Sequence, residues 1–376
     1  MHVFIQSIIG QILFGSYIAF RGGQAIPSSK LRKAFYGLLL AEFLFFLVGF
    51  SFRSVLSKEA MAVMINVTGT WYFASIYISM AIFAVNLVRR MAKKRFQRME
   101  EQCYCRLKAF LFVAIAIGTS LLIVKGYFNV LHPIVRHYTV RLNKPLGNGQ
   151  KRIRLLFMSD LHFSEAVTGR YARNIVELSN RQQADILLVG GDIFDYWADF
   201  GYRDSIPQRM ASIDAPLGKY YVMGNHDYRA NVAEKKAWVS LVDGILLIDS
   251  IAYPKQVPFV LIGRDDATQK KRSSLKGLTQ QIDSIYASFP RVLLEHQPVE
   301  LDSLPVHGVD LALYGHTHNG QVWPFGWLVR LAFEKTWGYL NKKGTHVVVS
   351  SGAGAAGPAI RIGTRSELVV IDLIGG

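Results

Sequence analysis

Cysteine is nearly absent from this chain: Cys103 and Cys105 are the only two, and they lie two positions apart. Without partners elsewhere they support neither a disulfide framework nor a cysteine zinc site. Acidic residues are also in the minority, with 27 Asp and Glu against 43 Lys and Arg and a formal net charge of +16. A nucleic-acid binder would carry that charge on one face of a folded domain. Here many basic residues flank apolar segments, so a membrane surface is the expected partner and nucleic acid is not.

Charge is missing from long stretches of the N-terminal third. The chain has 376 residues and is 51% hydrophobic, and the apolar excess lies before about residue 130. Four apolar runs fill this region, at residues 3–20, 34–52, 61–88 and 109–130. The first three have the ~18 residues typical of a transmembrane helix, and the fourth has them only if Lys125 snorkels. We expect an all-α four-helix transmembrane bundle over residues 1–130, with a buried helical bundle as the alternative. The first run lacks the basic start of a cleavable signal peptide.

The loops between these runs differ in basic residues. The first loop holds Arg21, Lys30, Arg32 and Lys33, the second Arg53 and Lys58, and the third eight Lys and Arg between residues 89 and 108. The positive-inside rule makes loops one and three cytoplasmic. The C-terminal part would then be extracytoplasmic in a multi-pass protein of a bacterial inner membrane. If one of the four runs does not span the membrane, the C-terminal part faces the cytoplasm instead. Glu42, inside the second run, is interpreted as a structural hydrogen-bonding group rather than an intramembrane functional carboxyl.

From about His137 the pattern changes to short apolar strands, glycine turns and polar helices. This alternation predicts an α/β domain over residues 137–376. The expected strands are 137–142, 153–158, 185–189, 219–223, 259–263, 291–294 and 311–314, and a helix is expected over 171–182.

Pairs of potential metal ligands follow several of these strands. His316 and His318 lie two positions apart after the strand 311–314, and Asp160 and His162 do so after the strand 153–158. In an extended segment such side chains point the same way, so each pair could converge on one ion. An equally good interpretation is that Asp160 is a turn aspartate and His162 a surface histidine, neither of them a metal ligand. His296 also stands at a strand tip, where a lone histidine is more often structural.

Two further clusters end in polar residues. Asp192 follows two glycines after the strand 185–189, and its two carboxylate oxygens could bridge two ions. Asn225 offers a neutral carbonyl oxygen. His226 beside Asp227 is typical of a general acid held by an orienting carboxylate, although simple turn chemistry would also explain them. Asp195 could support the metal ligands from behind, but a solvated loop acid is the favoured interpretation.

Together these clusters resemble the calcineurin-like metallophosphoesterase superfamily over roughly residues 137 to 376. The matching motifs are Asp160-Leu161-His162, Gly190-Gly191-Asp192, Gly224-Asn225-His226-Asp227, His296 and Gly315-His316-Thr317-His318. Gly320-Gln321, Ser351-Gly352 and Gly357-Pro358 are similar to a membrane-linked branch. That branch includes the YkuE and YaeI type and transmembrane proteins with a metallophosphoesterase domain.

The resemblance implies a domain of two packed mixed β-sheets flanked by helices, with two divalent metal ions. Asp160, His162 and His318 would hold the first, Asn225, His296 and His316 the second, and Asp192 would bridge them. Nitrogen and oxygen ligands without thiolate fit Mn, Fe or Zn. Such a pair activates a water for in-line attack on phosphorus. His226 would be the general acid or a phosphate contact, oriented by Asp227.

The expected function is an integral membrane phosphoesterase acting on a phosphorylated lipid or lipid-linked diphosphate. The segment 321–333, dense in aromatics, is interpreted as an apolar lip facing lipid or the helical bundle, and otherwise as a buried connection. Relatives imply one specific alternative, UDP-2,3-diacylglucosamine hydrolysis in lipid A synthesis. An alternative of another class is a catalytically silent membrane scaffold or sensor.

Overall fold

The structure is a computed structural model that describes residues 2–52, 55–146, 151–253 and 259–376. Arg53, counted above in the second loop, lies outside the described residues. The chain divides into two compact units, Met1–Gly126 and Tyr127–Gly376, and each is described by itself.

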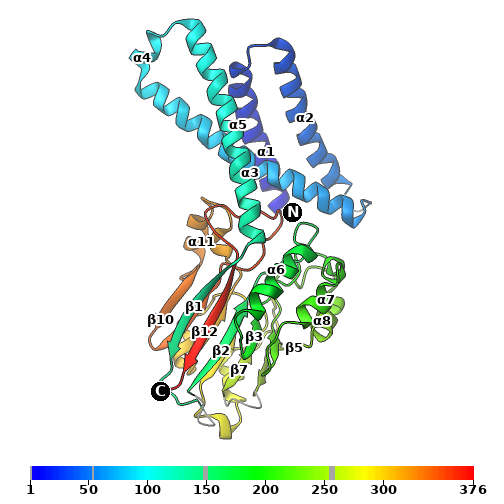
Figure 1. Ribbon diagram of the computed structural model, residues 1–376, viewed down its shortest axis with the longest axis vertical. Helices are drawn as coiled ribbons and strands as arrows, with labels where there is room; N and C mark the ends of the chain where they lie inside the picture. Colours follow the sequence, from blue (N-terminus) through cyan, green and yellow to red (C-terminus); the bar gives the residue numbers. More distant parts are fainter. Residues whose placement is uncertain (1, 53–54, 147–150, 254–258) are drawn as a thin grey trace. The chain divides into compact units, whose positions relative to one another are not determined.

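The first unit is helical (Figure 1). Its long helices are α1 (His2–Ala25), α2 (Ser29–Ser51), α3 (Lys58–Met91) and α5 (Glu101–Leu131), and the short α4 (Lys93–Gln97) connects α3 to α5. Ser28 and Ser57 cap α2 and α3, since each hydroxyl accepts a hydrogen bond from a first-turn amide, of Leu31 and Ala60 respectively.

Three of these helices, α2, α3 and α5, are long and apolar enough to cross a membrane. They contain or overlap the last three predicted runs. The first run is helical too, as α1, but α1 is not among the candidate spans of the described residues, so the predicted count of four is not confirmed. Inside the unit, Gln11 of α1 donates a hydrogen bond to Glu42 of α2 over 3.3 Å, in agreement with a structural role for this carboxyl.

The second unit contains two six-stranded mixed sheets. The first has the order β1 (Ile134–Arg141), β12 (Glu367–Ile374), β2 (Arg152–Met158), β3 (Ile186–Val189), β4 (Lys219–Tyr221), β5 (Ile245–Leu246). The second has the order β10 (Gly338–Lys342), β11 (Thr345–Val349), β9 (Leu311–Tyr314), β8 (Arg291–Leu294), β7 (Val260–Gly263), β6 (Ser250–Ala252). The helices of this unit are α6 (Gly169–Asn180), α7 (Ile206–Ala211), α8 (Val232–Leu241), α9 (Leu275–Gln280), α10 (Ser303–Val306) and α11 (Gly326–Ala332).

Alternation along the central strands buries both faces of both sheets. On β2, Leu155 and Phe157 pack between the sheets, while Leu156 and Met158 face a second core shared with α6, α7 and α8. On β9 the same alternation directs one set of side chains between the sheets and the other toward a third core with α9 and α10. The strands therefore read as continuous apolar runs, and the unit has two sheets between two helical layers. This agrees with the predicted α/β architecture.

We predict that Trp238→Ala weakens the second unit. Trp238 is fully buried on α8, contacts the rings of Phe163, Phe194 and Tyr221, and donates from its indole nitrogen to the Gly201 carbonyl over 2.9 Å. Its removal leaves a cavity that costs about 3–5 kcal/mol of unfolding free energy. Denaturant unfolding of the full-length protein in detergent, followed by circular dichroism, would measure the loss. Val306→Ala, at a side chain 78% exposed, is the control and should change stability little.

Candidate metal centre

The structure brings the predicted site residues together at one edge of the second unit. They follow the carboxyl ends of β2, β3, β4, β8 and β9 and are Asp160, His162, Asp192, Asn225, His226, Asp227, His296, His316 and His318. Because β2, β3 and β4 run parallel in one sheet and β8 and β9 in the other, the strands of each sheet deliver these residues to a common edge.

The local backbone differs from the extended geometry that the i, i+2 spacing suggested. Five of these residues have left-handed backbone, with φ of 56° at Asp160, 48° at His162, 51° at Asp192, 69° at His316 and 48° at His318. This conformation costs a non-glycine residue roughly 1–2 kcal/mol. The convergence therefore comes from tight turns held by the surrounding structure rather than from strand pleating.

Gly315 shows how closely these turns pack. A side chain at this position would collide with Ser159 and with the Asp160 carboxylate. The absence of a side chain also lets the next amide, of His316, donate to both Asp160 oxygens over 3.1 Å.

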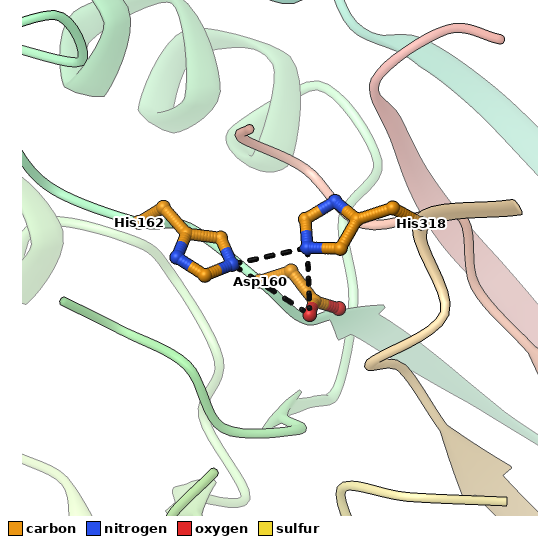
Figure 2. A group of neighbouring side chains, drawn as sticks. All are labelled: Asp160, His162 and His318. Atoms are coloured by element: carbon orange, nitrogen blue, oxygen red, sulfur yellow. Dashed lines mark hydrogen bonds and ion pairs between the residues drawn. The ribbon is translucent and has the colours of Figure 1, made fainter. Parts of the chain in front are cut away.

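Asp160, His162 and His318 form the first cluster (Figure 2). Nε2 of His318 lies 3.3 Å from Oδ1 of Asp160, and Nε2 of His162 lies 3.9 Å from the same oxygen. The two Nε2 atoms are 3.0 Å apart. Two ring nitrogens this close repel each other unless a proton or a cation lies between them.

Asp192, His296 and His316 form the second cluster. Nε2 of His296 lies 3.2 Å from Oδ2 of Asp192 and 3.2 Å from Nδ1 of His316. The other ring nitrogen of His296 contacts the Gly190 carbonyl at 2.7 Å, which leaves Nε2 as the nitrogen that faces the cluster.

Asp192 lies between the two clusters. Its Oδ2 is 3.2 Å from Nε2 of His296 in the second and 3.7 Å from Nε2 of His162 in the first. The turn that carries Asn225 and His226 is held here too, because the His226 amide donates to Oδ1 of Asp192 over 2.7 Å. Oδ1 of Asn225 is buried without a hydrogen-bond partner among the described residues. An orphaned amide oxygen beside carboxylates and imidazoles is a free ligand position.

The spacing of the donor atoms fits metal coordination. Two nitrogen or oxygen ligands on one zinc-like ion lie roughly 3.0–3.5 Å apart, given metal–ligand distances of about 2.0–2.2 Å. Three of the contacts within the clusters are 3.0–3.3 Å long, and the contact of His162 with Asp160 is longer, at 3.9 Å. The donor set of carboxylate, imidazole and amide oxygen suits a divalent ion of the Mn, Fe or Zn type.

Electrostatics in this buried site keep the carboxylates charged. Burial alone would raise the pKa of Asp160 and Asp192, but His318 beside the first and His296 beside the second outweigh it and lower both pKa values. Burial lowers the pKa of His316 and of His318 to about 4. Burial also opposes charge on His296, but Asp192 raises the pKa of His296 to about 10.

His226 is oriented by Asp195, a residue for which the sequence favoured a solvated position over a supporting one. Its Nδ1 lies 3.0 Å from the Asp195 carboxylate and 2.7 Å from the Asp195 carbonyl. The same carboxylate lies 3.2 Å from Nδ1 of His162. Asp195, expected to be solvated, has a side chain only 18% exposed, and although burial opposes it, the adjacent His162 and His226 rings lower its pKa. Its position three residues after Asp192 is the signal that could have found it.

Asp227 has a different environment from the one expected. Its carboxylate accepts hydrogen bonds from the amides of Gly224, Ile193 and Phe194 at 2.9, 3.3 and 3.2 Å. These contacts join the turn after β4 to the turn after β3. The structure thus places Asp195, rather than Asp227, against the His226 ring.

Arg361 is a second supporting residue without a sequence signal. It is fully buried, and its guanidinium lies 2.8 Å from Nδ1 of His318 and donates to the carbonyls of Ser351 and Gly354. Burial lowers its pKa to about 10, so it remains charged at neutral pH. With Nδ1 so engaged, Nε2 of His318 faces Asp160 and His162.

Comparison with known proteins finds several sequences that are similar to this chain. A family description of calcineurin-like phosphoesterases matches residues 153–320. An uncharacterized metallophosphoesterase of Helicobacter pylori strain J99 is 28% identical over 272 residues, covering 71% of this chain and 71% of the relative. An uncharacterized metallophosphoesterase of Campylobacter jejuni is 23% identical over 394 residues, covering 99% of this chain and 98% of the relative.

A vertebrate protein is also similar. The transmembrane protein with metallophosphoesterase domain of Danio rerio is 28% identical over 274 residues, covering 68% of this chain and 61% of that relative. Among solved structures, sulfate thiohydrolase SoxB of Thermus thermophilus aligns with a TM-score of 0.36 at 15% identity, covering 59% of this chain and 56% of that one.

We predict that Asp195→Asn lowers metal affinity by roughly 10–100-fold, because an amide holds the His162 and His226 rings less firmly than a carboxylate does. Metal titration of the full-length protein, followed by hydrolysis of a chromogenic phosphate ester at saturating metal, separates this effect from a loss of turnover. Asp214→Asn removes an exposed carboxylate of the same unit and is the matched control. Equal metal affinity in both variants would contradict the positioning role.

Proposed function

The chain carries a calcineurin-like metallophosphoesterase domain and is a hydrolase of phosphoester bonds, and from this premise we propose that it uses two divalent ions to hydrolyse a phosphorylated membrane lipid. The observation that carries the two-ion part is Oδ2 of Asp192, which lies within 3.7 Å of an imidazole nitrogen of each cluster. A carboxylate shared in this way is typical of a bridging ligand.

In the proposed assignment, Asp160, His162 and His318 hold one ion. Asn225, His296 and His316 would hold the other, and Asp192 would be a ligand of both. Bound ions would lower the pKa of a water between them and polarise the phosphate. The two carboxylates offset only part of the charge of two divalent ions, so the site stays positive toward a phosphate ester.

His226 has the geometry of a general acid. Asp195 engages its Nδ1, which leaves Nε2 to reach the substrate. As water attacks phosphorus and the bond to the leaving oxygen breaks, His226 would donate its proton to that oxygen, and Asp195 would stabilise the charged ring beforehand.

Support for a membrane protein comes from the three apolar helices and from relatives named transmembrane proteins with a metallophosphoesterase domain. The expected orientation has partial support. Arg21 from the first basic loop and Arg89 and Lys108 from the third line one cavity, so these basic groups lie at the same end of the helical unit. Even if α1 does not span, the positive-inside rule then favours an extracytoplasmic catalytic domain, because only α5 separates the third basic loop from that domain in the chain.

Support for a lipid substrate comes from α11, which follows the His318 turn. Trp327, Leu328 and Leu331 on this helix are 62%, 62% and 86% exposed, which favours the apolar lip over a buried connection. Directly after it, the Phe333 ring contacts the His316 ring at a centroid distance of 5.5 Å. An exposed apolar helix next to a metal ligand suits a substrate presented in a lipid surface.

We predict that Asp192→Asn lowers turnover by roughly 100-fold or more and reduces bound metal, because the bridge loses its charge and one ligand oxygen. The test is hydrolysis by the detergent-purified full-length protein with added Mn, together with metal content by mass spectrometry. Substrates would be p-nitrophenyl phosphate, bis-p-nitrophenyl phosphate, UDP-2,3-diacylglucosamine and a polyprenyl diphosphate. Full activity of Asp192→Asn would refute the assignment, and a wild-type protein that binds two metals without turnover would favour the silent scaffold.

We predict that the double variant Trp327→Ser, Leu331→Ser lowers kcat/KM about tenfold or more for a vesicle-borne lipid substrate and leaves p-nitrophenyl phosphate hydrolysis unchanged. Each apolar side chain contributes roughly 1.5–3 kcal/mol when buried, so loss of lipid contact acts only on the lipid substrate. Ile285→Ser, Val306→Ser removes two exposed apolar side chains elsewhere in the unit and is the control. A similar loss in both double variants would argue against a lipid-facing α11.

A further inference from the structure

The helical unit contains a cavity that the proposed reaction does not use. It is lined by residues of α1, α3, α4 and α5, and a second cavity adjoins it and shares Arg21, Arg89 and Tyr104. Both lie within residues 21–115 and therefore inside one compact unit, at the end where α4 connects α3 to α5 (Figure 1).

Basic side chains gather around this cavity without acidic partners. Arg21, Arg89 and Lys108 line it, and Arg90 and Lys93 line its neighbour. No Asp or Glu is among the described residues that line either one. Several cations that share a cavity repel one another, so an anion entering it would relieve that repulsion.

Tyr104 holds two of these cations on one side chain. The Arg89 guanidinium donates to the Tyr104 hydroxyl over 2.5 Å, and Nζ of Lys108 lies 4.8 Å from the centre of the same ring. The ring of Phe96 packs edge-on against Tyr104. The aromatic pair thus fixes two positive groups beside each other, an arrangement suited to a phosphate with several acceptor oxygens.

Arg21 adds a buried donor with no partner. Its Nε is buried and makes no hydrogen bond to the described residues, although Nη1 of the same guanidinium contacts Gln24 at 3.4 Å. A buried N–H without an acceptor costs roughly 1–3 kcal/mol, which a ligand oxygen would recover.

Apolar side chains continue the cavity along the helices. Ile82 of α3 and Leu111, Phe112 and Ile115 of α5 line the part away from the basic groups, in two of the three helices that are apolar enough to span a membrane. A soluble phosphate would fill only the basic part, whereas a lipid would place its phosphate among the cations and an acyl chain along the apolar part.

We propose that this cavity binds the phosphate headgroup and one acyl chain of an anionic phospholipid. The site is separate from the metal centre, and the proposal does not depend on the proposed function. Its residues make it a lipid-binding site of the helical unit rather than a place of hydrolysis, because no carboxylate or imidazole is among the described residues that line it.

The test is native mass spectrometry of the full-length protein in detergent, titrated with dioleoyl phosphatidylglycerol or dioleoyl phosphatidylcholine. EDTA is present throughout, so that the metal centre contributes nothing. We expect the first phosphatidylglycerol to bind at least about tenfold more tightly than phosphatidylcholine. The triple variant Arg21→Gln, Arg89→Gln, Lys108→Gln should lose this preference.

The matched control is Lys94→Gln, Arg95→Gln, Arg98→Gln, which removes the same charge from exposed residues of the same basic segment that line neither cavity. It should keep the preference within about twofold. An equal loss in both triple variants would show general attraction to surface charge and overturn the proposal.

A further variant keeps every charge. It tests the site independently in case the triple variant at Arg21, Arg89 and Lys108 does not fold. Leu111→Trp fills the apolar part and should weaken phosphatidylglycerol binding while the helical circular dichroism signal stays unchanged. If inorganic phosphate displaces phosphatidylglycerol and Leu111→Trp has no effect, the ligand is a soluble phosphate and the lipid proposal is overturned. Equal binding of the two lipids by the unmodified protein would overturn it as well.

Discussion

Charge compensation in a buried site is the constraint on which the catalytic unit depends. Asp160 and Asp192 are almost fully buried, and imidazole nitrogens lie 3.2–3.9 Å from their oxygens. Buried carboxylates need positive charge nearby, and ring nitrogens 3.0 Å apart need a cation or a proton between them. Two divalent ions would meet both requirements, whereas protons meet them only in part, through a histidine such as His296 that must then stay charged.

The turns that carry the ligands are stabilised by other polar groups. Asp227 accepts three backbone hydrogen bonds from the turns after β3 and β4, and Arg361 connects the His318 ring to the carbonyls of Ser351 and Gly354. These contacts offset the cost of left-handed backbone at the ligands. The candidate ligands are therefore positioned by residues that do not belong to either cluster: Asp227 holds the turns after β3 and β4, and Arg361 holds His318.

Motif spacing predicted much of this arrangement, because each ligand follows an apolar strand closely. His316, His318, Asp160 and Asp192 could be chosen from local pattern, and the parallel order of the strands brings them together. Arg361 could not be predicted, since its partner His318 is 43 residues away and no local pattern marks an arginine as buried. Asp195 was interpreted as solvated because its burial depends on two histidines, His162 and His226, that approach from separate turns. The i, i+2 spacing also suggested that the ligand side chains converge because the strand ends are extended. This reason was wrong, since sequence pattern cannot distinguish a pleated strand end from a left-handed turn.

The helical unit has the opposite electrostatic problem. Before residue 127 lie 15 of the 43 basic residues but only four of the 27 acidic ones, so most of the net charge of +16 belongs to this unit. Topology alone would explain exposed cations such as Lys94, Arg95 and Arg98, because the positive-inside rule asks only that they stay on one side. Topology does not explain why Nε of Arg21 is buried without an acceptor in the described part of the chain, or why two cations share Tyr104. Placing a guanidinium and an ammonium group around one cavity costs free energy that a topological signal does not require. A bound phosphate recovers that free energy, which is why the cavity is better understood as a ligand site than as part of the basic loops.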